Sequence, residues 1–266
     1  MTRLILAVVV VLGGTGCRIL PPPNGTGVEA TGQAWLRAAT PANPNHWPSL
    51  ALAATYPYWR DHDDRLSVHL ARNKKYAGPS GDDYGDRLTV TLAALPILPA
   101  IYEAWVVGDR QSTLRWIEVV AETSLANLVL TEGLKDLVRR ERPDNNSGIG
   151  GRDRPSTRSF PSGHVMGAMT GAALFGRYLR EQDPWFTFAE LALYGGVGYV
   201  AITRLEHDKH WPTDVVMSAA LAHYVANTVW DAHYGRDGKP GLFDRLPRPI
   251  PVPMGDGIGV MFGVEF

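Results

Sequence analysis

Residues 112–140 carry apolar side chains at roughly helical spacing and contain no proline, a pattern that constrains the fold to include one long helix. Pro143 disfavours the α conformation for Arg142, so the helix is expected to end near Arg142. Lys135 lies seven residues before Arg142, about two turns or about 10 Å along a helix, which predicts both cations on one face. They could hold one anion together, or only complement the negative end of the helix dipole.

A second predicted helix, residues 165–179, follows a loop at residues 144–160 that is rich in Gly, Ser, Asn and Arg. Ser162 is a natural N-cap for this helix, and Gly163 lets a ligand come close. The amide groups of a first helical turn, with the positive end of the dipole, favour a bound phosphate. His164 lies in that turn, where it could protonate a departing alkoxide. The alternative is an ordinary capped helix with an incidental histidine.

A third predicted helix begins at Pro212 and runs to about Trp230. That start places His210 in the entering loop and Asp214 in the opening turn. A carboxylate at Asp214 could accept a hydrogen bond from one imidazole nitrogen and leave the other nitrogen free to attack. Arg204 is expected to close the preceding helix and to point into the same loop. In the competing interpretation, Asp214 only complements the helix dipole and His210 is solvated.

Three strings of residues, 135–143, 161–164 and 204–214, contain these candidates. Ten of their positions have a fixed order and spacing, namely Lys135, Arg142, Pro143, Pro161, Ser162, Gly163, His164, Arg204, His210 and Asp214. They resemble the three-part signature of the type 2 phosphatidic acid phosphatase family, which includes bacterial acid phosphatases and shares its site with vanadium haloperoxidases. The one departure is Thr203, where the family usually has serine, and a hydroxyl is retained. The resemblance implies an all-α helical bundle over roughly residues 85–235.

The resemblance also implies a role for each site residue. His210 would be the nucleophile that forms a phosphohistidine, Asp214 would orient it, and His164 would be the general acid and later the base that activates water. The phosphoryl oxygens would be held by Lys135, Arg142, Ser162, Gly163 and Arg204. Phosphoryl transfer depends mostly on positioning and charge stabilisation. Since three fixed cations and a helix N-terminus can replace Mg²⁺, we expect neither a metal nor a cofactor.

These residues predict an enzyme that hydrolyses phosphate monoesters of lipids or small molecules. Two other classes stay open: a vanadium-dependent haloperoxidase with His210 as the vanadate ligand, and a non-enzymatic envelope lipoprotein. The net charge of -1 provides no global basic field for nucleic acid. The sequence leaves the substrate and the oligomeric state undetermined.

The N-terminus is typical of a secretory signal. A short positive region, residues 1–3, precedes the apolar stretch Leu4–Leu12, which is too brief to span a bilayer. The small residues that follow lead to Cys17, the only cysteine, as in a bacterial lipoprotein cleavage site, although Gly14 stands where leucine is usual. We therefore expect lipidation of Cys17 and a periplasmic protein tethered to a membrane by lipid. A simple signal peptide is the rival interpretation.

Composition divides the chain into four expected segments, a signal peptide (1–17), an irregular tether (18–48), a helical phosphatase domain (49–235) and a Pro/Gly-rich tail (236–266). Alternating apolar residues near the C-terminus predict a half-buried strand that ends the tail. Two apolar stretches, 88–107 and 215–230, raise the question of membrane spans. A mean hydropathy of -0.12 and 20% charged residues favour a bundle that buries both stretches.

Two further clusters of polar residues have a solvated surface as the alternative to a functional role, and for the first cluster the solvated surface is expected. Residues 61–75 could form an accessory helix, but its acidic and histidine residues match no metal-ligand spacing (His62, Asp63, Asp64 and His69). Three arginines in the loop before the second string could meet a second anionic group of the substrate or remain in solvent (Arg152, Arg154 and Arg158).

Overall fold

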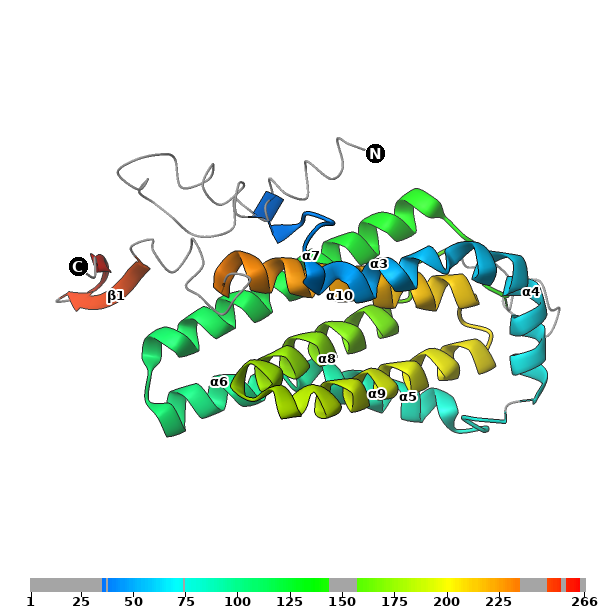
Figure 1. Ribbon diagram of the computed structural model, residues 1–266, viewed down its shortest axis with the longest axis horizontal. Coiled ribbons are helices and arrows are strands. Elements are labelled where there is room, and N and C mark those ends of the chain that lie inside the picture. Colours follow the sequence, from blue (N-terminus) through cyan, green and yellow to red (C-terminus); the bar gives the residue numbers. More distant parts are fainter. Residues whose placement is uncertain are drawn as a thin grey trace. The chain divides into compact units, whose positions relative to one another are not determined.

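The computed structural model describes residues 35–36, 38–73, 75–143, 157–234, 248–254 and 257–263. Most of these residues lie in the helices α3 (Trp47–Ala54), α4 (Tyr56–Asn73), α5 (Gly81–Ala94), α6 (Ile97–Tyr102), α7 (Arg110–Val138), α8 (Gly163–Gln182), α9 (Thr187–Glu206) and α10 (Pro212–Tyr234) (Figure 1). Shorter helical segments are the 3-10 helices Pro44–His46 and Pro184–Phe186 and the π-helix Glu103–Val107. The predicted all-α fold class is confirmed. The predicted signal peptide, Cys17 and most of the predicted tether lie outside the described residues.

The chain divides into two compact units, one formed by Pro41–Asn227 and the other by Met1–Thr40 with Thr228–Phe266. All the described residues of the three sequence strings lie in the larger unit. The predicted domain boundaries at residues 48 and 235 stay predictions.

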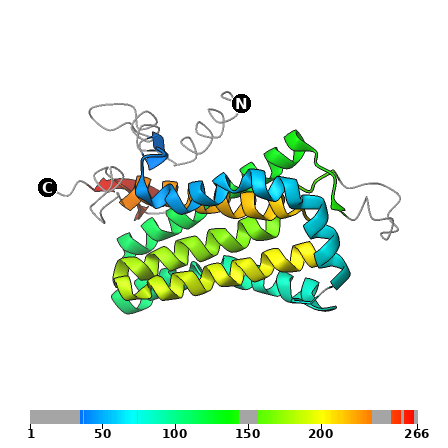
Figure 2. The same ribbon diagram turned by 45° about the vertical axis from the view of Figure 1, so that its right-hand side comes forward.

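Helix α8 packs against three neighbours in the larger unit. It contacts α5, α7 and α9, and α5 also packs against α9, as the two views in Figures 1 and 2 illustrate. The close approach of α8 to α5 depends on Gly171, where a Cβ atom would lie 2.0 Å from the carbonyl oxygen of Leu92. Because no side chain fits there, glycine allows the two backbones to meet.

Helix α7 ends about one turn earlier than the sequence predicted. Its last residue is Val138, and Arg139 has a left-handed φ of 49° that turns the chain out of the helix. The exit segment then runs beside the segment before α8, where the Ser159 amide donates to the Arg140 carbonyl at 2.9 Å. Arg142 lies beyond the helix, so the prediction that Lys135 and Arg142 share one helical face is wrong.

The other predicted helix boundaries around the three strings are confirmed. Helix α8 begins at Gly163, directly after Ser162. Arg204 lies in the last turn of α9. Helix α10 begins at Pro212 with Asp214 in its first turn.

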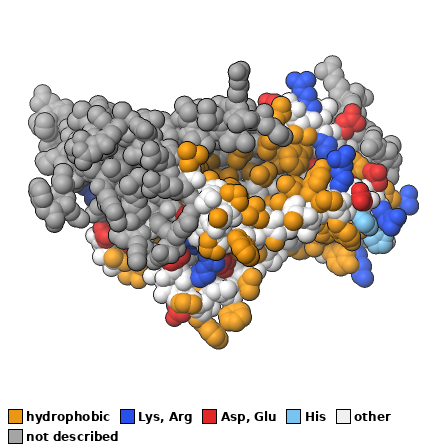
Figure 3. Space-filling view, turned by 45° about the horizontal axis from the view of Figure 1, so that its top comes forward, with side chains coloured by type: hydrophobic (Ala, Val, Ile, Leu, Met, Phe, Trp, Pro, Cys, Tyr) orange, Lys and Arg blue, Asp and Glu red, His pale blue; other side chains and the backbone are white. Residues whose placement is uncertain are grey.

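Two helical stretches among the described residues are long and apolar enough to cross a membrane, Gly81–Val107 and Pro184–Glu206. Only 17% and 22% of their most apolar windows are buried inside the protein, so the predicted burial is wrong for residues 88–107. Their large exposed apolar side chains include Val90, Ile97, Leu98, Ile101, Trp105, Val106, Val107, Trp185, Phe186, Phe188 and Leu191. Figure 3 shows a face on which hydrophobic side chains gather. Exposed apolar helices of this length indicate association with a membrane.

The second apolar stretch noted in the sequence behaves as predicted. Residues 215–230 lie in α10 and are mostly buried. This stretch therefore forms part of the core of the protein.

The described part of the tail is an antiparallel hairpin of β1 (Arg248–Met254) and β2 (Gly257–Gly263), in which Val252 pairs with Gly259. Strand β1 has proline at every second position. Because proline has no N–H, β1 can donate backbone hydrogen bonds along one edge only. The predicted terminal strand corresponds to β2, and its partner in the tail is β1.

Candidate active site

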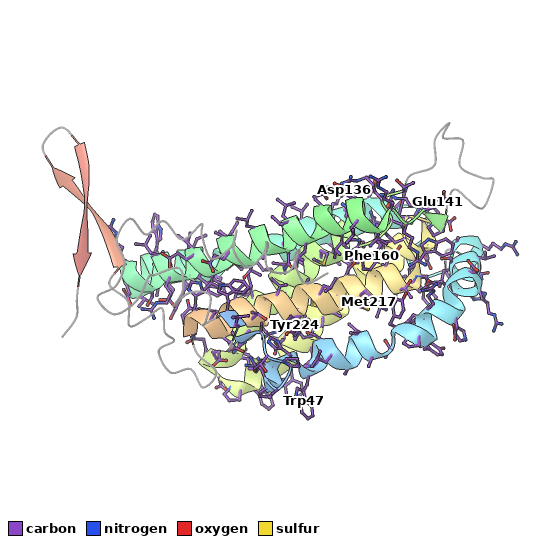
Figure 4. All side chains as sticks on the ribbon, turned by 90° about the horizontal axis from the view of Figure 1, so that it is seen from above. Trp47, Asp136, Glu141, Phe160, Met217 and Tyr224 are labelled. Carbon is purple, nitrogen blue, oxygen red and sulfur yellow. The ribbon has the colours of Figure 1, made fainter. Side chains whose placement is uncertain are left out.

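The three sequence strings meet at one end of the larger unit. A Cβ atom on Gly163 would lie 3.6 Å from Lys135 Nζ, which brings the first and second strings together. His210 Nδ1 lies 2.6 Å from the Ser159 carbonyl oxygen, which joins the third string to the segment before α8. In Figure 4 the labelled Phe160 lies at the end of the larger unit where α7 ends and α10 begins.

The ring of His210 is buried and held in one tautomer. Its side chain is 4% exposed. A carbonyl oxygen only accepts hydrogen bonds, so the short contact with Ser159 requires the hydrogen on Nδ1 and leaves a lone pair on Nε2. Burial lowers the pKa of His210 below its ordinary value of 6.5, and the Arg142 guanidinium lowers it further, against the opposing charge of Asp214. The interpretation of His210 as a solvated loop residue is therefore excluded.

Asp214 is connected to His210 through Ser159. Its nearest oxygen is 3.9 Å from His210 Nδ1, beyond hydrogen-bond distance. The same oxygen accepts from the Ser159 hydroxyl at 2.5 Å and from the Trp211 amide at 3.0 Å. The direct His–Asp bond expected from sequence is thus replaced by a chain in which Ser159 contacts both groups, His210 through its carbonyl and Asp214 through its hydroxyl.

A partly buried ion pair fixes Asp214 on its other side. Arg140 donates from Nη1 to Asp214 at 2.7 Å and from Nη2 to Asp63 on α4 at 2.6 Å. Although burial opposes its charge, hydrogen bonds and the Arg140 guanidinium hold the pKa of Asp214 below its ordinary value of 3.8. Asp63 also accepts from the amide and hydroxyl of Thr213 at 2.9 and 2.6 Å, in the first turn of α10. Asp63 is buried, so its predicted solvation is wrong.

Two buried hydrogen-bond donors of the residues expected to hold the phosphoryl oxygens have no partner among the residues that the structure describes. They are the hydroxyl of Ser162 and Nε of Arg142. Ser162 holds the N-cap position predicted for it, but its side chain makes no capping bond and its amide donates to Ser218 at 2.8 Å. Since buried donors are nearly always satisfied, these two indicate an acceptor supplied by a ligand.

Two of the predicted cations and the second histidine have acidic neighbours. Lys135 Nζ lies 2.7 Å from Glu132. Arg204 Nη1 and His164 Nε2 lie 2.9 and 3.0 Å from the same oxygen of Asp86 on α5. Burial lowers the pKa of His164 below 6.5, and the charge of Arg204 lowers it further, while Asp86 opposes the shift.

The arginine-rich loop is described only at its end. Arg158 forms ion pairs with Glu132 and Asp136 of α7, and its side chain is 45% exposed, in agreement with the solvated alternative. Arg152 and Arg154 lie outside the described residues. Within the described part of the chain, no group of three or more His, Cys, Asp or Glu residues is placed to hold a metal ion.

Four residues of this site were not predicted from the sequence: Ser159, Arg140, Asp63 and Asp86. Arg140 and Ser159 stand next to the recognised strings, and the run of basic residues after Lys135 was the one signal for Arg140. Asp63 and Asp86 come from helices whose separation from their partners exceeds 70 residues, so no local pattern could reveal them.

Comparison with known proteins agrees with this geometry. The family model for the PAP2 superfamily matches residues 118–237, which include all three strings. Over these residues the chain is similar to the PAP2 superfamily. Its residues are 34% identical over 74 positions to a lipid A 1-phosphatase of Porphyromonas gingivalis, covering 27% of this chain and 16% of that protein. They are 33% identical over 103 positions to a decaprenylphosphoryl-5-phosphoribose phosphatase of Mycobacterium tuberculosis, covering 39% and 53%.

The chain spans about half or less of the length of the curated relatives it matches. Among solved structures, it is similar to a transmembrane PAP2 type phosphatidylglycerolphosphate phosphatase from Bacillus subtilis. That match has a TM-score of 0.49 and 19% identity, and it covers 68% of this chain and 94% of the other.

Proposed function

We propose that this protein is a membrane-associated phosphatase that hydrolyses lipid phosphate monoesters through a phosphohistidine on His210. The observation that carries the proposal is the buried His210 ring, whose Nδ1 is tied to a carbonyl while Nε2 keeps its lone pair. Near this ring, the buried donors of Ser162 and Arg142 lack acceptors in the described chain. A phosphoryl group supplies both an electrophile and acceptor oxygens.

In the first step, the lone pair of His210 Nε2 forms a bond to phosphorus as the bond to the leaving oxygen breaks. His164 gives that oxygen its proton. In the second step, His164 takes a proton from water, whose oxygen attacks phosphorus and displaces His210. The phosphoryl oxygens are held by Lys135, Arg142, Arg204, Ser162 and the Gly163 amide. Asp214 steadies the ring through Ser159.

The same cations account for the proposed independence from divalent metals. Lys135, Arg142 and Arg204 bring three positive charges, and the N-terminus of α8 adds its dipole. These groups can stabilise the charge that metal ions stabilise in many other phosphoryl transferases. Vanadate, which mimics the pentacoordinate phosphorus, is expected to occupy the same site.

The lipid substrate class follows from the two exposed apolar helical stretches. Asp86 and Arg204 form an ion pair at one end of the packed helices α5 and α9. From Asp86 to Val107, and from Arg204 back to Trp185, each helical stretch extends about 30 Å at about 1.5 Å per residue. The hydrocarbon core of a bilayer is about 30 Å thick. Helices inserted to that depth would hold the site at the membrane surface, where lipid phosphates lie.

Both curated relatives bear names of phosphatases that act on lipid-linked substrates. This agrees with a lipid phosphate substrate for the present chain. We further propose a periplasmic site of action with a lipid anchor on Cys17.

Phosphate release from vesicles tests the proposed function. Full-length protein reconstituted with diacylglycerol phosphate or polyprenyl phosphate is expected to release phosphate in EDTA, with kcat/KM at least about tenfold above that for p-nitrophenyl phosphate. Vanadate is expected to inhibit both reactions. Loss of turnover in EDTA that a divalent ion restores, or vanadate-dependent halide oxidation in place of hydrolysis, would contradict the proposal.

The pH dependence of kcat/KM is expected to peak below pH 6.5. Attack requires neutral His210, and leaving-group protonation requires charged His164. Burial lowers the pKa of both rings below 6.5, so His210 remains neutral in mildly acidic solution and His164 loses its proton before neutrality. A profile measured with an alkyl phosphate ester, whose leaving oxygen needs a proton, should therefore fall as the pH rises toward neutrality. A kcat/KM that keeps rising above neutral pH would contradict the roles assigned to His210 and His164.

A further inference from the structure

Asp86 lies between two groups that the proposed mechanism assigns to the substrate. One of its carboxylate oxygens accepts from Arg204 Nη1 at 2.9 Å and lies 3.0 Å from His164 Nε2. Arg204 is proposed to hold a phosphoryl oxygen, and His164 is proposed to protonate the leaving oxygen. The carboxylate oxygen of Asp86 therefore stands where an oxygen of the phosphate ester has to be.

The contact between α5 and Arg204 is built into the fold. Arg204 Nη2 donates to the Asp82 carbonyl at 2.9 Å, and the Asp82 carboxylate lies 2.8 Å away without hydrogen-bond alignment. Gly85 permits this approach, because a Cβ atom there would lie 2.2 Å from the Thr203 hydroxyl. The buried Glu206 accepts from two amides just before α5, at 2.8 and 2.7 Å. The acidic turn of α5 is thus fixed against the last turn of α9.

The side chains of Arg204 and Asp86 differ in their freedom to move. The Arg204 side chain is 4% exposed and both of its terminal nitrogens contact α5, so it cannot turn away to meet a ligand elsewhere. The Asp86 side chain is 55% exposed and can rotate into water. Two anionic oxygens cannot share one position on Arg204, because like charges repel at that distance. Binding of a phosphate ester therefore requires Asp86 to leave.

We propose that Asp86 is an internal competitor for the phosphate site and determines its affinity for substrate and product, an inference that rests on the proposed phosphatase function. Its carboxylate occupies the Arg204 and His164 donors when no phosphate is bound and turns to solvent when phosphate enters. Three cations and a helix N-terminus would otherwise hold the product phosphate tightly. The competing carboxylate weakens that hold and so favours product release.

Replacing Asp86 with asparagine tests the competition directly. Asp86→Asn is expected to lower the inhibition constants of inorganic phosphate and vanadate, and KM for p-nitrophenyl phosphate, each by about tenfold. Because the variant keeps both histidines, kcat should change by less than about threefold. Asp83→Asn is the matched control, since it removes one charge from the same turn at an exposed residue that has no hydrogen bond or ion pair among the described residues.

The outcomes separate the competitor role from its alternatives. If Asp86→Asn and Asp83→Asn have the same inhibition constant for inorganic phosphate, the proposed competition is contradicted. It is also overturned if Asp86→Asn loses kcat at unchanged inhibition constants, because Asp86 then assists His164 in catalysis. Asp86→Ser repeats the measurement should the asparagine variant not fold, as judged by its thermal unfolding. A wild-type protein that neither hydrolyses p-nitrophenyl phosphate nor is inhibited by vanadate would refute the phosphatase proposal itself.

Discussion

His210→Ala is expected to abolish phosphate release, with kcat lower by at least about 10³-fold, because the substitution removes the proposed nucleophile. The alanine leaves the cations and the N-terminus of α8 in place, so vanadate and phosphate should still bind. Brief reaction with radiolabelled phosphate ester, followed by denaturation, should give an acid-labile and base-stable phosphoenzyme in the wild type and none in the variant. The substitution should therefore lower kcat and leave the binding of vanadate and phosphate in place.

Two further variants serve as comparisons for His210→Ala. His207→Ala removes a neighbouring histidine of the same loop, which makes it the control for simple disturbance of the loop, and it should turn over at close to the wild-type rate. His164→Ala should still become phosphorylated by p-nitrophenyl phosphate, whose leaving group needs no proton, and should accumulate label because water is no longer activated. If His210→Ala keeps turnover or still traps phosphate, the nucleophile has been assigned wrongly.

The sequence predicted those parts of the fold that single residues control. Pro212 fits only the start of a helix, and the Ser162–Gly163 pair marks the start of α8, so both boundaries could be predicted from local preferences. The end of α7 could not, because Arg139 adopts a left-handed φ that arginine rarely takes without support from the surrounding structure. An early end of α7 separates Arg142 from the helical face of Lys135.

The composition of the candidate site was predicted, but its internal contacts were not. The three strings supplied the two histidines and the cations. The partners that fix them, Asp63 and Asp86, lie on helices α4 and α5 far away in sequence, and acidic residues there have the same local pattern as a solvated surface. Chain-wide hydropathy also averaged the apolar helices with the charged residues at the site, and so concealed how much of α9 and of residues 81–107 is exposed.

Asp214→Asn is expected to cost about 2–3 kcal/mol of unfolding free energy and to lower kcat by about 10²-fold. The wild-type carboxylate is fully buried and accepts from Arg140, the Ser159 hydroxyl and the Trp211 amide. An amide in its place lacks the charge that offsets Arg140 and presents a donor to groups that also donate. The rate falls because Ser159, which holds His210 Nδ1, loses its anchor.

Asp63→Asn distinguishes the two effects, because Asp63 is the other carboxylate partner of Arg140 but has no contact with Ser159 or His210. Its loss should reduce the unfolding free energy by a similar amount, measured by denaturant titration of tryptophan fluorescence, with kcat within about fivefold of the wild type.

Acid should destabilise the wild type more than Asp214→Asn, because a carboxylate with a depressed pKa loses its stabilising charge as the pH falls through that pKa. A direct hydrogen bond from His210 Nδ1 to Asp214 would instead predict a loss of about 10⁴-fold in kcat for Asp214→Asn. Ser159→Ala decides between the two arrangements: it should slow turnover if the hydroxyl connects Asp214 to the histidine, and it should have no effect if Asp214 contacts the ring directly.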